Sequence, residues 1–166
     1  MNIGCDPTAD YADDADQDRL SKPRIKRIAR MGTIIQEELS HTIIGTAMEV
    51  LNELKPGLDE KLYERALVIE LGRRGHTVEA QRSFPVFYRG EIIGDLTPDL
   101  IVDDAVIVDS KVVSSFNDAH VAQMIGYLTI TGLELALLLN FKSVRLEWKR
   151  VVRQHKSESD VPDLRG

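Results

Sequence analysis

The run over residues 135–141, apolar except for Asn140, is the feature that most constrains how this chain of 166 residues can fold. Such a run is typical of a strand buried on both faces of a sheet. The segment before it, residues 118–131, begins with Asp118, which can cap a helix, and is followed by Gly132, a residue common after helix ends. A strand that follows a crossover helix pairs parallel to its neighbour. The sequence therefore predicts an α/β fold, with a mixed central sheet flanked by helices.

The other periodic segments predict two helices before the sheet and four further strands. Apolar residues that recur every three or four positions indicate amphipathic helices, whereas alternating, β-branched stretches bounded by turn residues indicate strands. The expected helices are residues 34–54 and 58–74, and the expected strands are residues 78–88, 92–102, 106–113 and 144–149. Pro85 marks the first of these strands as an edge or a bulge. We expect Tyr63 to pack against the sheet, and Phe141 and Trp148 to lie in the core rather than to stack on nucleic-acid bases.

The two ends of the chain lack apolar periodicity. Residues 1–18 contain six Asp and no Lys or Arg, and residues 19–30 contain six basic residues and no acid. Polar segments of this kind do not bury enough apolar surface to fold. We therefore expect a disordered charged arm over residues 1–30, one domain over residues 31–153 and a polar tail over residues 154–166.

The charge and the cysteine content bound the function and the compartment. A net charge of −6 counts against tight, nonspecific binding of nucleic acid by the domain. Two basic segments, residues 19–30 and 142–156, could contact phosphate or could be solvated surface. The single cysteine, Cys5, cannot form an internal disulfide, and no apolar run approaches the ~20 residues that a membrane-spanning helix needs. These features predict a cytoplasmic protein.

The turn at residues 103–104 brings two carboxylates onto one face of the sheet. If the loop has three residues, the register places Asp99 directly across from Asp109. A loop of two residues would shift this pairing by one position. Lys111 lies two residues after Asp109 and therefore points to the same face.

Opposed carboxylates repel each other, and a cation between them removes the conflict. Oxygen ligands from one or two carboxylates are what Mg²⁺ prefers. The ion could polarise a phosphodiester oxygen and activate an attacking water, and the Lys111 ammonium could stabilise the charge that develops on phosphorus. Alternatively, Asp99 ends a strand, Asp109 is solvated and Lys111 neutralises both. The spacing alone does not decide between these interpretations.

Four short motifs, taken in order, resemble those of one nuclease family. They are Pro98-Asp99 with Asp109-Ser110-Lys111, the string Gly57-Leu58-Asp59-Glu60-Lys61-Leu62-Tyr63, the segment His120-Val121-Ala122-Gln123 with Tyr127-Leu128, and Leu138-Leu139-Asn140-Phe141. The first resembles the signature of the PD-(D/E)XK nuclease superfamily. The other three resemble its GxxExxY branch, and the resemblance covers about residues 43–152.

This resemblance implies a restriction-endonuclease-like αβββαβ core, in agreement with the predicted order of elements. It also implies a nuclease that depends on Mg²⁺ or Mn²⁺ and acts on nucleic acid, with DNA as the expected substrate. The implied metal ligands are Glu60, Asp99, Asp109 and the Ser110 carbonyl; the implied catalytic residues are Lys111, Asp99, Asp109, Glu60 and Gln123; and the implied substrate contacts are His120, Gln123 and Tyr127. The Tyr127 side chain also suits packing.

Two departures from the branch keep other functions open. The branch usually carries Glu-x-Lys, whereas Asp109 is one methylene shorter, and residues 96–98 lack the aromatic and Arg often found there. A nuclease-fold module that binds nucleic acid or protein without catalysis, or a hydrolase of another phosphate ester, is therefore an alternative. The sequence leaves open DNA or RNA, cleavage inside or at the end of a strand, and the oligomeric state, a homodimer included.

Overall fold

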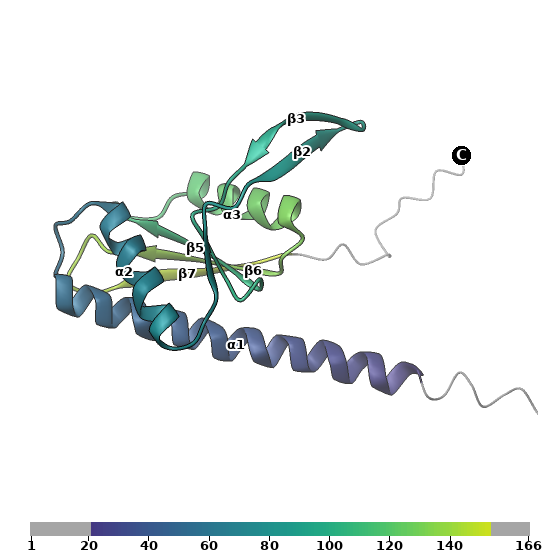
Figure 1. Ribbon diagram of the computed structural model, residues 1–166, viewed down its shortest axis with the longest axis horizontal. Helices are drawn as coiled ribbons and strands as arrows, with labels where there is room; N and C mark the ends of the chain where they lie inside the picture. Colours follow the sequence, from purple (N-terminus) through teal and green to yellow (C-terminus); the bar gives the residue numbers. More distant parts are fainter. Residues whose placement is uncertain (1–20, 154–166) are drawn as a thin grey trace, which may run out of the picture. The chain divides into compact units, whose positions relative to one another are not determined.

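The computed structural model describes residues 21–153 of the chain (Figure 1). In chain order the elements are α1 (Ser21–Leu54), α2 (Glu60–Arg73), β1 (Val78–Ala80), β2 (Phe84–Tyr88), β3 (Glu91–Leu96), β4 (Leu100–Val102), β5 (Val106–Lys111), α3 (Asp118–Thr131), β6 (Leu135–Asn140) and β7 (Glu147–Val152). Two units, Met1–Ile35 and Gln36–Gly166, divide the chain, and α1 contributes to both. The sheets and all the residues predicted for the site lie in the second unit.

The main sheet has five strands in the order β1-β4-β5-β6-β7. Strands β5 and β6 pair parallel, whereas the other neighbours in the sheet pair antiparallel. The crossover between the two parallel strands is α3. The predicted α/β fold, with a mixed sheet flanked by helices, is therefore confirmed.

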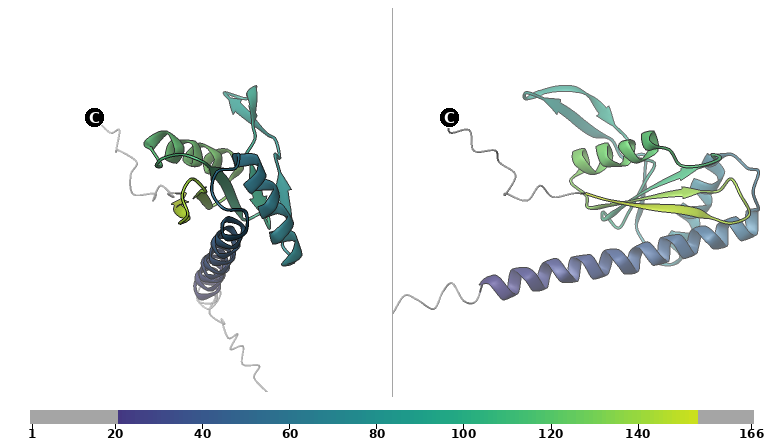
Figure 2. Two further views of the ribbon diagram at one scale, coloured as in Figure 1. Left: turned by 90° about the vertical axis from the view of Figure 1, so that its left-hand side faces the viewer. Right: turned by 180° about the vertical axis from the view of Figure 1, so that it is seen from behind.

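Helices cover both faces of this sheet (Figure 2). One core cluster joins the sheet to α2 and to the second-unit part of α1, and the other joins the opposite face to α3. All six residues of β6 are buried, so the apolar run that marked this strand in the sequence lies between the two layers. The strand that neighbours it on one side, β5, ends at Lys111 and carries Asp109 and Ser110 into the same buried layer.

The two long strands expected over residues 78–88 and 92–102 are each divided. Their outer parts form β1 and β4, which pair with each other in the main sheet, and their inner parts form a separate ribbon, β2–β3. Gln81 has a positive φ, and the ribbon shifts register between Val86 and Phe87. The prediction of two continuous strands is wrong. The chain leaves the sheet at Gln81, before it reaches Pro85, because the positive φ of Gln81 lies outside the extended region.

Several element boundaries also differ from the prediction, most clearly those of α1, β7 and α3. Helix α1 begins at Ser21 rather than at residue 34, because Lys and Arg favour helix even without apolar periodicity. Strand β7 begins at Glu147 rather than at residue 144. The N-cap of α3 is Asn117 rather than Asp118, since the Asn117 side chain accepts a hydrogen bond from the backbone of His120.

Residues 1–20 and 154–166 lie outside the described residues. They include the acidic part of the expected arm and the expected tail, so the division of the chain into arm, domain and tail stays a prediction. Over the span that the structure describes, none of the helices combines the length and the apolar character needed to cross a membrane.

The Tyr63 side chain fixes the start of α2. Its ring is fully buried and stacks on Phe141 with a centroid separation of 4.5 Å and an interplanar angle of 10°. Its hydroxyl donates to the Lys55 carbonyl at 2.7 Å and accepts from the Leu58 backbone N–H at 3.3 Å. The α1–α2 connection is thus held to the helix that it precedes, and Glu60 at the first position of α2 is placed by the same contacts.

We expect Tyr63→Phe to lower the free energy of unfolding by about 1–2 kcal/mol, because it leaves the Lys55 carbonyl and the Leu58 N–H without this partner. Urea denaturation followed by circular dichroism measures the change. The control is Tyr88→Phe, whose side chain is 59 % exposed on the ribbon and should change stability by less than about 0.5 kcal/mol. Equal effects of the two substitutions would contradict the role assigned to the Tyr63 hydroxyl.

Candidate active site

The β4–β5 hairpin carries Asp99 and Asp109 to the same place. Its loop has three residues, 103–105, as the carboxylate pairing requires, and Leu100 pairs with Val108. One step further along the register, Asp99 follows opposite Asp109, so both side chains point to the face of the sheet that α3 covers. The register predicted from the turn is confirmed.

Helix α2 supplies two more carboxylates. Glu60 and Glu64 are four residues apart and therefore lie on one face of the helix. A carboxylate oxygen of each lies, together with one of Asp99, in a group whose members are all within 4.8 Å of one another. Glu60 and Asp99 were predicted as metal ligands, but Glu64 was not. In the sequence Glu64 only repeats Glu60 one helical turn later, a pairing that is mildly unfavourable on a helix and that surface glutamates share.

Asp109 stands beside this group and pairs with Lys111. Its carboxylate is only 1 % exposed, and its Oδ1 lies 2.6 Å from the Lys111 Nζ. The same Nζ lies 3.9 Å from Glu60 Oε1. Among the described residues Asp109 Oδ2 has no hydrogen-bond partner although it is buried. Lys111 therefore links Asp109 to the three converging carboxylates, and one buried oxygen remains available to a ligand.

Burial and neighbouring charges shift the pKa values of the carboxyl groups upward. Burial, followed by the charges of Asp99, Glu60 and Asp109, raises the pKa of Glu64 to about 7. Burial also raises the pKa of Asp109 to about 6, against the lowering effect of the Lys111 ammonium. Asp99 has a raised pKa for the same reason, although Lys111 and Lys61 oppose the shift. The site thus holds more negative charge than its surroundings solvate well.

Lys111 remains a cation in this setting. Burial by itself lowers the pKa of its ammonium group, but the carboxylates of Asp109, Glu60 and Asp99 outweigh burial and raise the pKa above its ordinary value. The position of an ammonium between carboxylates is suited to binding an anionic group that enters the site.

The predicted residues of α3 fall into two groups. Burial and the charges of Asp109 and Asp99 raise the pKa of the Tyr127 hydroxyl, to which Gln123 Nε2 donates a hydrogen bond at 3.0 Å. His120 instead caps the helix, because its Nδ1 accepts from the Asn117 N–H at 3.2 Å. A substrate contact by any of the three stays a prediction.

Ser110 lies between Asp109 and Lys111 in β5, so its side chain points to the opposite face of the sheet. The side chain is fully buried, and its Oγ has no hydrogen-bond partner within the described part of the chain. The predicted contribution of Ser110 to a metal is through its backbone carbonyl, which remains a prediction.

The donor set suits a hard divalent cation. Three carboxylates converge, a fourth carries a buried oxygen that has no partner within residues 21–153, and all the donors are oxygen atoms. Mg²⁺ and Mn²⁺ take carboxylate oxygens of this kind. A cation would also stabilise the charged form of these carboxylates, which burial and, for Glu64 and Asp109, the neighbouring carboxylates disfavour. The residues present therefore fit such an ion.

A comparison with known protein families identifies the chain. The family described as the PD-(D/E)XK nuclease superfamily matches residues 37–151, a span that contains all the residues predicted for the site. The chain belongs to the PD-(D/E)XK nuclease superfamily. Members of this superfamily act on nucleic acid and generally use divalent metals. No curated protein matches the chain.

Solved structures similar to this superfamily member are distant in sequence. The alkaline exonuclease LHK-Exo from Laribacter hongkongensis is 12 % identical with a TM-score of 0.40, and LHK-Exo in complex with dAMP is 12 % identical with a TM-score of 0.41; each match covers 65 % of this chain and 76 % of the other. SSO0001 is 15 % identical with a TM-score of 0.45, covering 80 % of this chain and 61 % of the other. At this distance the three structures do not bear on substrate or mechanism.

The raised pKa values predict how stability depends on pH without metal. A carboxyl group whose pKa is higher in the folded state binds its proton more tightly there, so stability falls as the pH rises through that range, here from about pH 4 to about pH 7 for Glu64 and Asp109. In EDTA, Glu64→Gln should therefore gain stability relative to the parent protein between pH 5 and pH 7.5. Thermal unfolding at the two pH values measures the gain. Glu53→Gln, at an exposed position of α1, is the control; a gain of the same size in both variants would contradict the assignment to Glu64.

Proposed function

We propose that the protein is a nuclease dependent on Mg²⁺ or Mn²⁺ that hydrolyses phosphodiester bonds of DNA, and that it belongs to the GxxExxY branch. The observation that carries the proposal is the convergence of Glu60, Glu64 and Asp99 beside the Asp109–Lys111 pair. Two of the four sequence motifs supply Glu60, Asp99, Asp109 and Lys111 to this arrangement. The single cysteine suits the cytoplasm as its location.

The four carboxylates would hold the cation. Glu60, Glu64 and Asp99 offer converging oxygens, and Asp109 Oδ2 is a buried oxygen without a partner among the described residues. When bound, the ion supplies charge that polarises a phosphodiester oxygen and lowers the pKa of an attacking water. Asp99 and Asp109 come from a rigid hairpin, and Glu60 and Glu64 come from a helix fixed by Tyr63, so the ligands need little reorganisation.

Lys111 would act on the phosphate. Its ammonium lies 2.6 Å from Asp109 and 3.9 Å from Glu60, which keeps it charged and limits its position. An ammonium placed there can bind a phosphate oxygen and stabilise the negative charge that develops as the phosphodiester is attacked.

Gln123 and Tyr127 would contact the same substrate from α3. The Gln123 amide donates to the Tyr127 hydroxyl, so the two side chains have fixed relative positions. The raised pKa of Tyr127 keeps its hydroxyl protonated and able to donate a hydrogen bond to a phosphate oxygen. His120 is a candidate contact at the start of the same helix.

A second candidate is a module that binds nucleic acid without cutting it. It is favoured by the close Asp109–Lys111 pair, in which the lysine already neutralises one of the carboxylates. Binding by such a module would survive both EDTA and Asp99→Asn, whereas the nuclease requires the metal and the carboxylate.

Cleavage of plasmid DNA, single-stranded DNA and RNA with Mg²⁺ or Mn²⁺ tests the proposal. We expect cleavage that EDTA abolishes, and losses on the order of 10²-fold or more in Asp99→Asn, Glu64→Gln and Lys111→Met, because each removes charge that the transition state requires. Measured rates for the purified variants give the losses directly.

The matched control is Asp95→Asn, an exposed carboxylate of β3 four residues before Asp99. It should cut at the parent rate. Cleavage that is equally fast in Asp99→Asn would identify a contaminating enzyme, and no cleavage of any substrate with either metal would overturn the nuclease in favour of the binding module.

A further inference from the structure

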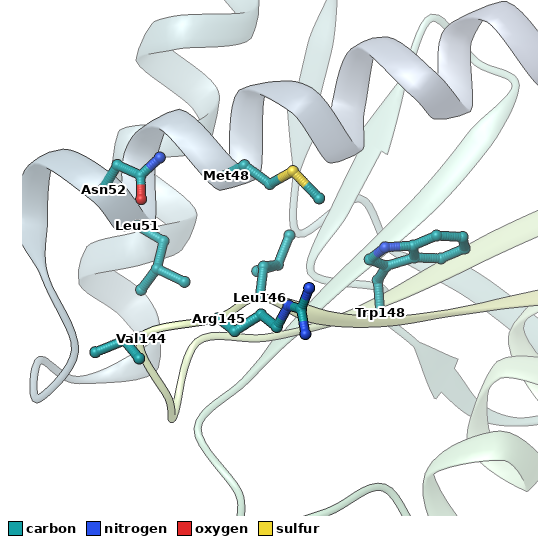
Figure 3. A pocket seen from close by; sticks show the side chains of 7 residues that line it. All are labelled: Met48, Leu51, Asn52, Val144, Arg145, Leu146 and Trp148. Carbon is teal, nitrogen blue, oxygen red and sulfur yellow. The ribbon is translucent and has the colours of Figure 1, made fainter.

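Trp148 does not lie in the core as expected, since the residue is 45 % exposed. It lines a groove of about 470 Å³ between α1 and the segment that connects β6 to β7 (Figure 3). This size is within the range in which proteins hold ligand-sized groups. The residues that line the groove are Met48, Leu51, Asn52, Val144, Arg145, Leu146 and Trp148.

The groove combines an exposed aromatic ring with a cationic side chain. Figure 3 shows the Arg145 guanidinium and the Trp148 indole on the β6–β7 side of the groove, with Met48 facing them from α1. The apolar floor is formed by Leu51 and Leu146, which are both nearly buried. A flat aromatic surface next to a cation is the arrangement that takes a planar, negatively substituted group.

The surface around the groove is basic although the protein as a whole is acidic. Residues 142–153 carry five basic side chains, Lys142, Arg145, Lys149, Arg150 and Arg153, and a single acid, Glu147. The carboxylate of Glu147 accepts a hydrogen bond from Asn140 Nδ2 at 3.2 Å. Of these, Arg145 lines the groove and Arg150 lies on the same face of β7 as Trp148, and both are exposed, whereas Lys149, opposite Leu138, points to the face that α3 covers. Charge complementarity therefore favours an anionic occupant.

The groove and the carboxylate site lie at the same end of the sheet, on opposite faces. Trp148 pairs with Leu139, and Lys111 pairs with Asn140, the next residue of β6. The side chain of Leu139 belongs to the core cluster of α1 and α2, whereas that of Leu138, the partner of Asp109, belongs to the cluster of α3. A flexible chain that passes around this end of the sheet could therefore contact both.

We infer that this groove binds single-stranded nucleic acid, with a base stacked on Trp148 and a neighbouring phosphate at Arg145. The bases of a duplex are stacked on each other, so only an unpaired base can offer its face to the indole. The inference rests on the proposed function only in taking nucleic acid as the ligand. It does not depend on catalysis, and it makes the groove a second contact for a strand whose scissile bond lies at the carboxylates.

A second copy of this chain is a poorer occupant. A twofold contact through this surface would bring the surface against itself. The basic residues of each copy would then meet those of the other, and like charges at an interface oppose association.

Binding of oligonucleotides in EDTA tests the inference, and Asp99→Asn in parallel removes any dependence on cleavage. Trp148 is the only tryptophan of the chain, so its fluorescence reports on the groove directly. We expect quenching by short oligo-dT or oligo-rU; comparison of the two separates DNA from RNA as the ligand. By anisotropy of a labelled oligonucleotide, Trp148→Ala should weaken binding roughly tenfold. Arg145→Ala should lower the salt slope of log K by about 0.7, the value for one phosphate contact.

The matched control is an aromatic–basic pair on the ribbon, Tyr88 with Arg89, where the guanidinium lies 5.4 Å from the ring centroid. Tyr88→Ala and Arg89→Ala should leave affinity unchanged. Absence of quenching, equal losses in Trp148→Ala and Tyr88→Ala, or a change of mass in sedimentation on Trp148→Ala would each overturn the inference. Quenching in a protein that cuts no substrate would refute the proposed function and leave the groove assignment intact.

Discussion

Four carboxylate side chains lie around one ammonium group in this structure. Glu60, Glu64 and Asp99 converge, Asp109 is buried beside them, and Lys111 pairs with Asp109 and Glu60, while the charge of Lys61 also acts on Asp99 and Glu64. Like charges at such separations oppose folding, and burial adds to the cost because it removes the water that would solvate them. The raised pKa values of Glu64 and Asp109 express this cost. A divalent cation bound among the four carboxylates would replace their mutual repulsion with attraction to the ion.

The rest of the second unit holds these charges in place against their repulsion. Strand β6 is buried over its whole length and supports β5, which carries Asp109 and Lys111. Tyr63 stacks on Phe141 at the end of that strand and ties the start of α2 to the connection before it. The hydrophobic clusters on both faces therefore supply the stability that the site itself lacks. The end of the sheet therefore carries the candidate site, and the interior of the sheet carries the packing that stabilises the fold.

Much of this arrangement could be predicted from the sequence, because it follows from local rules. The three-residue turn determines the register of the hairpin, and the register places Asp99 across from Asp109. Tertiary packing decided the rest. Glu64 repeats Glu60 one helical turn later, but surface glutamates do the same, and only its proximity to Asp99 distinguishes it. The alternation around Trp148 suggested a half-buried strand with Trp148 in the core. In the fold Trp148 lines a groove that α1 helps to form, and local sequence does not reveal this neighbour.

The position of a bound metal tests the central claim most directly. Crystals of the protein grown with Mn²⁺, and measured at a wavelength where manganese scatters anomalously, would locate the ion without reference to activity. We expect one anomalous peak roughly 2.0–2.3 Å from carboxylate oxygens of Glu60, Glu64 and Asp99. Density at full Mn²⁺ occupancy elsewhere, or none at these oxygens, would contradict a metal centre built from the helix and the hairpin.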